Sequence, residues 1–299
     1  MMKMVVVELV GGHCNSRCLW CFTTYKCRDK MVRGMMDLDN FRRFISLNRD
    51  SVFRLIPFSH GEALIHPDFV TCCAYALDNG FPLQHIHTNL AMDLTTEHFD
   101  ILARFTEVVV NVGGGCPETH YVNTGTNFDT VLANLQDLSK RNPEILKVKM
   151  VVNRNNLSEL GILKRRIHGI HPSISVSSYP VYFGPADSDD EDRKRFFLEN
   201  LATEDGNRVN RKIKCRDKVK ITKDGRILVS PRLGRCYGLI PTIRWDGSVN
   251  ICCRARYHER SEGDAFSESL DSIMRSEQYR EALKQGRKRT YVDYCHYCS

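Results

Sequence analysis

The chain has 299 residues, of which 42% are hydrophobic and 26% are charged. This composition is that of an ordinary globular protein and excludes a disordered, collagen-like or long coiled-coil chain, and no apolar run approaches the roughly 20 residues of a membrane-spanning helix. The net charge of +7 is concentrated in residues 208–226, which carry nine Lys or Arg and two Asp or Glu, so we do not expect a nucleic-acid-binding protein.

Strands and helices are predicted to alternate over the first 182 residues. Short β-branched runs predict strands, and runs with apolar residues three or four positions apart predict helices. In chain order, the predicted strands are 5–10, 53–59, 83–88, 108–112, 148–152 and 174–182, and the predicted helices are 37–47, 67–79, 95–104, 128–141 and 157–168. Repeated strand–helix units indicate an α/β fold with a parallel sheet and right-handed crossovers.

The pattern changes near residue 190. Residues 187–192 carry five acidic side chains, and the periodicity is weak from there to Gly234. Two short strands, 241–244 and 248–252, then flank Asp246-Gly247, which is typical of a β-hairpin turn, and a final helix is predicted at 270–285. We therefore predict a parallel α/β domain at 1–190, a linker with the basic stretch at 191–234, and a small hairpin and helix domain at 235–299.

Thirteen cysteines are the unusual feature of the composition. The first apolar run, residues 4–10, is too short for the core of a signal peptide, so we expect a cytoplasmic protein. In a reducing compartment, an odd number of cysteines does not indicate a disulfide framework. Seven cysteines fall in two spaced groups near the two ends of the sequence, which favours ligands of metal ions or iron–sulfur clusters.

The first group is Cys14, Cys18 and Cys21, with the spacing C-x3-C-x2-C directly after the first predicted strand. Three thiolates can bind three irons of a four-iron cubane and leave the fourth iron open. A structural zinc site is the alternative, with His13 or Cys27 as the fourth ligand. In a parallel barrel, the loop after a strand lies on the catalytic face, so the location favours catalysis.

With an aromatic residue at Trp20, this motif resembles the radical S-adenosylmethionine (SAM) superfamily. The resemblance implies a partial (βα)6 parallel barrel and a [4Fe–4S] cluster on the three cysteines, with SAM bound at the open iron. It implies cleavage of SAM to a 5′-deoxyadenosyl radical that abstracts hydrogen from a substrate, after an electron arrives from a donor such as flavodoxin or ferredoxin. No nucleic acid and no membrane are expected as partners.

Further motifs extend the resemblance along the chain. Residues 59–63 (Ser-His-Gly-Glu-Ala) follow the second strand, where the family usually has Gly-Gly-Glu-Pro, and Glu62 would accept a hydrogen bond from the SAM amino group. His60 stands where a glycine is usual, and either faces substrate or packs in the structure. The SAM-binding residues that the resemblance implies are Trp20, Gly61, Glu62, Asn89, Asn111 and Asn153.

The second group is Cys236, Cys252, Cys295 and Cys298. Four thiolates in two pairs can bind zinc or a cluster. The order of cysteine, hairpin, cysteine, helix and C-x2-C is similar to the SPASM/twitch extension of radical SAM enzymes, and the number of cysteines favours the twitch form with one auxiliary [4Fe–4S] cluster. Cys252 is preferred to Cys253 as a ligand because alternate residues of a strand face opposite sides.

The resemblance implies radical epimerisation or dehydrogenation of a carbohydrate or aminocyclitol, of the aminoglycoside type found in antibiotic biosynthesis. Radical modification of a ribosomally made peptide is the alternative. The acidic run at 187–192 favours a cationic small-molecule substrate. An epimerase must return a hydrogen atom to the substrate radical, and Cys253 is the candidate donor, with Cys116 as the next candidate.

Overall fold

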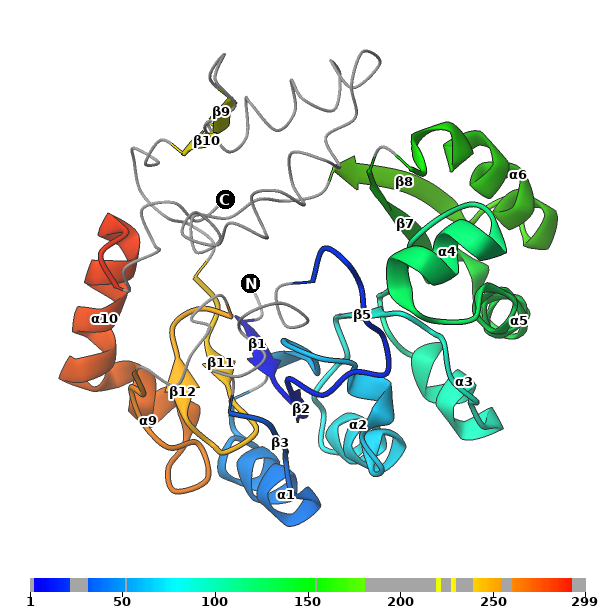
Figure 1. Ribbon diagram of the computed structural model, residues 1–299. Helices are drawn as coiled ribbons and strands as arrows, with labels where there is room; N and C mark the ends of the chain where they lie inside the picture. Colours follow the sequence, from blue (N-terminus) through cyan, green and yellow to red (C-terminus); the bar gives the residue numbers. More distant parts are fainter. Residues whose placement is uncertain are drawn as a thin grey trace.

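The computed structural model describes residues 3–21, 32–51, 53–153, 155–180, 219–221, 227–229, 239–253 and 260–291. Six parallel strands alternate with helices, and the helices lie outside the arc of strands (Figure 1). The order is β1 (Lys3–Val7), α1 (Leu38–Leu47), β4 (Phe53–Ile56), α2 (Phe69–Asp78), β5 (His85–Thr88), α3 (Thr96–Leu102), β6 (Glu107–Val112), α5 (Phe128–Ser139), β7 (Leu146–Val152), α6 (Leu160–Ile170) and β8 (Ser175–Pro180). All six predicted strands and five predicted helices of this region are therefore confirmed.

The strands form an open arc. β1 pairs in parallel with β4, and β5, β6, β7 and β8 form a second parallel sheet in that order. An isolated parallel bridge between Leu55 and Leu83 joins the two sheets, with the Gln84 amide donating to the Leu55 carbonyl oxygen at 2.8 Å. This arrangement confirms the predicted α/β fold with a partial parallel barrel.

Burial and capping explain the helices. The apolar face of α1 buries Phe41, Phe44 and Ile45, and its N-cap residue Asp37 accepts a hydrogen bond from the Asp39 amide at 2.9 Å. α5 is capped in the same way by Asn127, which accepts from the Asp129 amide at 2.7 Å. These helices cover the outer faces of strands whose valines are almost completely buried.

The C-terminal hairpin extends the first sheet. β11 (Thr242–Ile243) and β12 (Val249–Asn250) are antiparallel, as predicted, and β11 also pairs in parallel with β1. The sheet order is thus β12-β11-β1-β4, and the two ends of the sequence meet in it. The proposed division at residues 190 and 234 stays a prediction, because most of the linker lies outside the described residues; β9 (Val219–Ile221) and β10 (Ile227–Val229) form a separate antiparallel pair.

Two local features differ from the sequence expectation. α4 (Pro117–Thr124), which begins with a proline at its first position, was not predicted. The final helix is two helices, α9 (Leu270–Arg275) and α10 (Glu277–Lys288), because Ser276 is extended and its hydroxyl caps α10 at the Tyr279 amide. None of the described helices is long and apolar enough to cross a membrane.

Candidate metal centre

The loop of residues 12–21 carries the first cysteine group and begins just after β2 (Val10–Gly11), which pairs with β3 (Gly34–Met35). Cys14 is exposed, whereas Cys18 and Cys21 are half-buried. The backbone of the loop is fixed to α4, because the Arg17 amide donates to the Thr124 carbonyl oxygen at 2.7 Å and the Leu19 amide donates to Asn123 at 3.0 Å. The unpredicted helix α4 thus supports the cysteine loop.

The three thiols are close enough to influence one another's ionisation. Although Cys14 as a whole residue is exposed, partial loss of hydration around its thiol raises the pKa of Cys14 to about 11, and the neighbouring charges of Glu62 and Cys21 act in the same direction against the amide of Ser16. Burial, followed by the charges of Cys21 and Cys14, also raises the pKa of Cys18. Bound iron would reverse this preference, because each thiol loses its proton when it becomes a thiolate ligand of a metal.

Cys14, Cys18 and Cys21 share one loop of the structure, residues 12–21. Among the described residues, no three His, Cys, Asp or Glu side chains converge on a point where a single metal ion would be held. Each thiolate of a cubane binds a different iron, so its ligands need not converge as the ligands of one zinc ion do. Cys27, one of the two candidate fourth zinc ligands, lies outside the described residues.

Gly61 and Glu62 hold the cysteine loop from the other side. Gly61 has φ +100°, and a Cβ atom there would lie 2.3 Å from the His13 carbonyl oxygen, so glycine is required for this close approach. The Glu62 amide donates to the same oxygen at 2.9 Å. The Glu62 carboxylate accepts from the amides of Asn89 at 2.8 Å and Leu64 at 3.2 Å.

Glu62 is 3% exposed. Burial raises the pKa of Glu62, and the hydrogen bonds from the Asn89 and Leu64 amides and the Thr88 side chain oppose this rise without cancelling it. Its carboxylate therefore joins the loop after β4 to the loop after β5, beside the cysteines. This placement is compatible with the predicted contact to a SAM amino group. Glu62 also has a structural function, because it holds the two loops together.

Asn89 contacts the cysteine loop directly. Its side-chain nitrogen is 2.7 Å from both Asn15 Oδ1 and Ser16 Oγ, and 3.8 Å from Cys14 Sγ. Its side-chain oxygen accepts from the Ala91 amide at 2.9 Å, which fixes the orientation of the side-chain amide. The structure therefore brings Asn89 and Glu62 together beside Cys14, and their contact with SAM stays a prediction.

Tyr179, which the sequence analysis missed, lies opposite the cysteines at the end of β8. Its hydroxyl donates to Asn111 Oδ1 on β6 at 3.3 Å. Burial, followed by the negative potential of Cys18 and Cys21, raises the pKa of Tyr179 to about 12. Asn111 is thus brought to the same side of the barrel as the cysteine loop. The sequence offered one indication of a role for Tyr179 in the site, which is its place near the carboxyl end of the sixth strand.

Asn153 lies in a buried network behind this site. Its side chain is completely buried, donates to Asn123 Oδ1 at 3.1 Å and accepts from the Asn155 amide at 2.9 Å. Asn123 and Asn156 both donate to the Gly113 carbonyl oxygen, at 2.6 and 2.8 Å. Asn153 therefore fixes α4, which supports the cysteine loop, and its role as a SAM ligand stays a prediction. The same is true of Trp20, which is half-buried.

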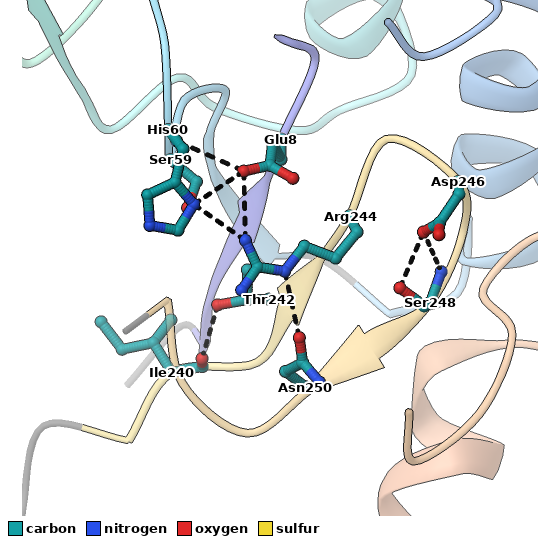
Figure 2. A network of polar contacts seen from close by, with 9 residues as sticks. All are labelled: Glu8, Ser59, His60, Ile240, Thr242, Arg244, Asp246, Ser248 and Asn250. Carbon is teal, nitrogen blue, oxygen red and sulfur yellow. Dashed lines mark hydrogen bonds and ion pairs between the residues drawn. The ribbon is translucent and has the colours of Figure 1, made fainter. Parts of the chain in front are cut away.

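A buried charge network joins the two ends of the chain beside this loop (Figure 2). Glu8 follows β1, His60 follows β4 and Arg244 follows β11, and these side chains are 1%, 8% and 3% exposed. Arg244 Nη1 donates to Glu8 Oε1 at 3.1 Å, and the same oxygen is 3.0 Å from His60 Nδ1. His60 is therefore a packed residue of this network, which decides between the two readings that the sequence left open.

The network has further partners on the hairpin. Arg244 Nε donates to Asn250 Oδ1 at 3.1 Å, so Arg244 also joins β11 to β12. Burial alone would raise the pKa of Glu8, but the hydrogen bond and charge of His60 and the charge of Arg244 outweigh it, so the pKa is lowered. The network therefore holds an ionised carboxylate inside the protein.

Trp245 adds apolar packing to this junction. A Cβ atom on Gly11 would lie 2.2 Å from the indole ring, and one on Gly34 would lie 2.4 Å from it. The ring thus lies against the β2–β3 pair, where only glycine leaves room. The hairpin of the C-terminal region is fixed by hydrogen bonds, charge and close packing to the strands that precede the cysteine loop.

The second cysteine group is only partly within the described residues. Cys252 and Cys253 are both half-buried, and Cys252 packs against the hydrophobic core. β12 ends at Asn250, before both cysteines, so the alternation argument used to prefer Cys252 does not extend to them. Cys236, Cys295 and Cys298 lie outside the described residues, and Cys116 is half-buried at the N-cap of α4.

Residues 239–299 match the SPASM family, described as an iron–sulfur cluster-binding domain. The chain is similar in structure to SuiB from Streptococcus suis bound to S-adenosylmethionine, with a TM-score of 0.64 and 12% identity. The similarity covers 100% of this chain and 72% of SuiB. SuiB is also known with its precursor peptide SuiA, with a TM-score of 0.60 and 12% identity over 99% of this chain and 71% of SuiB.

Two other solved structures are similar. The anSMEcpe structure with bound AdoMet has a TM-score of 0.66 and 13% identity over 98% of this chain and 81% of anSMEcpe. BtrN in complex with AdoMet and 2-DOIA has a TM-score of 0.54 and 14% identity over 100% of this chain and 93% of BtrN. A comparison with curated protein sequences returns no match. The chain therefore has the fold of these AdoMet-binding proteins, together with an iron–sulfur domain of the SPASM type.

Proposed function

We infer that this chain, which has the radical SAM fold and a SPASM-type C-terminal domain, is a radical SAM enzyme. The observation that carries this proposal is the placement of Cys14, Cys18 and Cys21 on one loop, beside Glu62 and Asn89. When bound, the cluster and SAM supply the one-electron chemistry that starts hydrogen abstraction from the substrate.

The chain's own residues would bind and orient these groups. Cys14, Cys18 and Cys21 would hold the cluster, and α4 would fix their loop through the Arg17 and Leu19 amides. Glu62 would accept from the SAM amino group, since a carboxylate has lone pairs beyond the two used by the Asn89 and Leu64 amides. The predicted contacts of Gly61, Asn111, Asn153 and Trp20 with SAM belong to the same proposal.

The C-terminal region would bind an auxiliary [4Fe–4S] cluster. The SPASM match over 239–299 supports this proposal, because it includes three of the four candidate ligands, Cys252, Cys295 and Cys298. Cys236 precedes the matched segment, and the twitch form with a single auxiliary cluster stays a prediction. An external electron donor such as flavodoxin or ferredoxin would reduce the enzyme.

For the reaction, we propose epimerisation or dehydrogenation of a carbohydrate or aminocyclitol. The similarity to BtrN in complex with 2-DOIA, over the whole of this chain, supports a small-molecule substrate. The similarity to SuiB bound to its precursor peptide supports the second candidate, radical modification of a ribosomally made peptide. Cys253 and Cys116 remain the candidate hydrogen-atom donors for an epimerase.

Anaerobic incubation with SAM, a reductant and candidate aminoglycosides in deuterated water tests the reaction. Deuterium incorporated at one carbon is expected for epimerisation, and the loss of two hydrogen atoms is expected for dehydrogenation, both read by mass spectrometry. Modification of a precursor peptide instead would establish the second candidate. If the reduced protein forms no 5′-deoxyadenosine from SAM under any of these conditions, the radical SAM assignment is wrong.

Glu62→Gln is expected to weaken SAM binding while the iron content stays unchanged. The substitution keeps the size of the side chain and one oxygen acceptor but removes the charge, and a charge-assisted hydrogen bond contributes about 1.5–3 kcal/mol. Equilibrium dialysis of the reconstituted protein with SAM measures this loss.

Glu159→Gln is the matched control for Glu62→Gln. Glu159 also accepts from backbone amides, those of Gly115 at 2.7 Å and Cys116 at 3.2 Å, but within the described residues none of its hydrogen bonds reaches the cysteine loop. The control variant should bind SAM normally. Unchanged SAM affinity in Glu62→Gln would restrict Glu62 to holding the loops together.

A further inference from the structure

The inner face of the barrel is polar and partly open to solvent. Along β5, β6 and β7, residues facing the helices are almost completely buried, whereas polar residues at alternating inward positions are partly exposed. The inward side chains relevant here are His85 and His87 on β5, Asn111 on β6, Lys149 on β7, and Ser177 and Tyr179 on β8. Because the opposite face forms the hydrophobic core, these residues have no core-packing function.

Lys149 carries a positive charge on this face without a direct hydrogen bond or ion pair among the described residues. Glu107 and Lys147, by contrast, form a hydrogen-bonded ion pair with each other. Lys149 does act on Glu107 from a distance: burial alone would raise the pKa of Glu107, but the hydrogen bond and charge of Lys147, followed by the charge of Lys149, lower it. Strand register places Lys149 between Asn111 and Ser177, which can donate hydrogen bonds but supply no negative charge.

The inner face also carries uncharged aromatic rings, on and next to β5. Burial, followed by the charge of Lys149, lowers the pKa of His87 to about 4, so its imidazole is uncharged near neutral pH. Phe58 stacks on His87 with ring centroids 5.0 Å apart and an interplanar angle of 24°, and meets the edge of His85 at 5.7 Å. A cation on β7 and an aromatic surface on β5 thus lie on the same inner face, on the two strands that flank β6.

The position of Lys149 is suited to contact with a substrate. It precedes Val151 by two residues, and Val151 is paired with Tyr179, whose environment includes Cys18 and Cys21. Lys149 therefore lies on the same face as the Val151–Tyr179 pair, but two residues further from the cysteine loop along the strand. A molecule bound to Lys149 at one end would extend past Asn111 and Tyr179 toward the candidate cluster.

We propose that Lys149 binds a carboxylate group of the substrate, on the inner face of the barrel. The single positive charge matches the single negative charge of a carboxylate, whereas a phosphate dianion would leave an excess negative charge in a partly buried place. The substrate is then an acidic sugar, cyclitol or peptide. The acidic run at 187–192, which favoured a cationic substrate, lies outside the described residues. This inference rests on the proposed function, because only that function identifies the bound molecule as the substrate of a radical SAM enzyme.

Binding of D-glucuronate and D-glucose, two sugars that differ by one carboxylate, tests the proposal. Saturation-transfer NMR on the full reconstituted chain should show D-glucuronate binding at least about tenfold more tightly than D-glucose, as expected for a charge-assisted hydrogen bond. Lys149→Met should abolish the preference, and Lys149→Arg should retain it. The control variant Glu107→Gln/Lys147→Met, which removes both members of the neighbouring ion pair on the same face, should also retain it.

Equal or undetectable binding of the two sugars by the wild-type protein would overturn the proposal. A preference that survives in Lys149→Met, or that is lost equally in Glu107→Gln/Lys147→Met, would also overturn it. If Lys149→Met instead weakens SAM binding, the recognised carboxylate is that of SAM and the substrate assignment is wrong. Cleavage of SAM by the wild-type protein is measured separately, so a failure of the proposed function is distinguishable from a failure at Lys149.

Discussion

Replacing Cys14, Cys18 and Cys21 together by Ala is expected to abolish SAM cleavage and to remove about four of about eight irons per chain. The three thiols lie on one loop and provide the protein ligands of the proposed first cluster, whereas the proposed auxiliary cluster uses cysteines of the C-terminal region. Iron and sulfide analysis after anaerobic reconstitution measures the loss, and detection of 5′-deoxyadenosine measures the activity.

Cys72→Ala is the control for this experiment. Cys72 is a buried cysteine of α2 in the hydrophobic core, outside both cysteine groups. Its replacement should leave the iron content and SAM cleavage unchanged. Retention of about eight irons in the triple variant would show that these thiols are not cluster ligands. One zinc ion and only about four irons in the wild-type protein would instead contradict the proposed auxiliary cluster.

Arg244→Met is expected to reduce the free energy of unfolding by about 3–5 kcal/mol. The substitution leaves the Glu8 carboxylate, which is 1% exposed, with His60 as its remaining partner in the network, and removing one partner of a buried ion pair is strongly destabilising. It also removes the bond to Asn250 that joins the two hairpin strands. Urea unfolding of the variant and the wild-type protein under identical conditions measures the difference.

Two variants separate the buried charge from general effects of substitution. In Glu8→Gln/Arg244→Met the buried charge is gone, so the double variant should be more stable than Arg244→Met alone. Arg141→Met removes a more exposed ion pair with Asp100, whose side chain is 62% exposed, and should cost less than about 1 kcal/mol. Equal losses in Arg244→Met and Arg141→Met would contradict the proposed function of the network.

The same network predicts a dependence of stability on pH. The pKa of Glu8 is lowered in the folded state, so its contribution is complete above the ordinary value of 4.5 and is lost as the pH falls through the lowered pKa. Arg244→Met should therefore lose less stability on acidification than the wild-type protein. Unfolding curves at neutral pH and below the ordinary pKa of Glu8 provide this comparison.

The sequence by itself determined the local elements and the two cysteine groups. Alternating β-branched and amphipathic runs reflect which face of each strand or helix is buried, so the six strands and five helices of the barrel could be recognised along the chain. The spacing of Cys14, Cys18 and Cys21 is equally local. The resemblance to the radical SAM superfamily implied a common site for Gly61, Glu62, Asn89 and the cysteines, and the ends of parallel strands do meet on one face.

Only the tertiary structure decided how the two ends of the chain meet. The pairing of β11 with β1 and the contact of Arg244 with Glu8 join residues more than two hundred positions apart. The spacing of hydrophobic residues along the chain contains no information about such a pairing. For the same reason, the sequence did not decide whether His60 faces substrate or packs in the structure. It also gave no indication that Tyr179 and Lys149 lie on the inner face of the barrel. Their environments depend on which strands become neighbours, which is settled by the folding of the whole chain and not by the residues next to them in sequence.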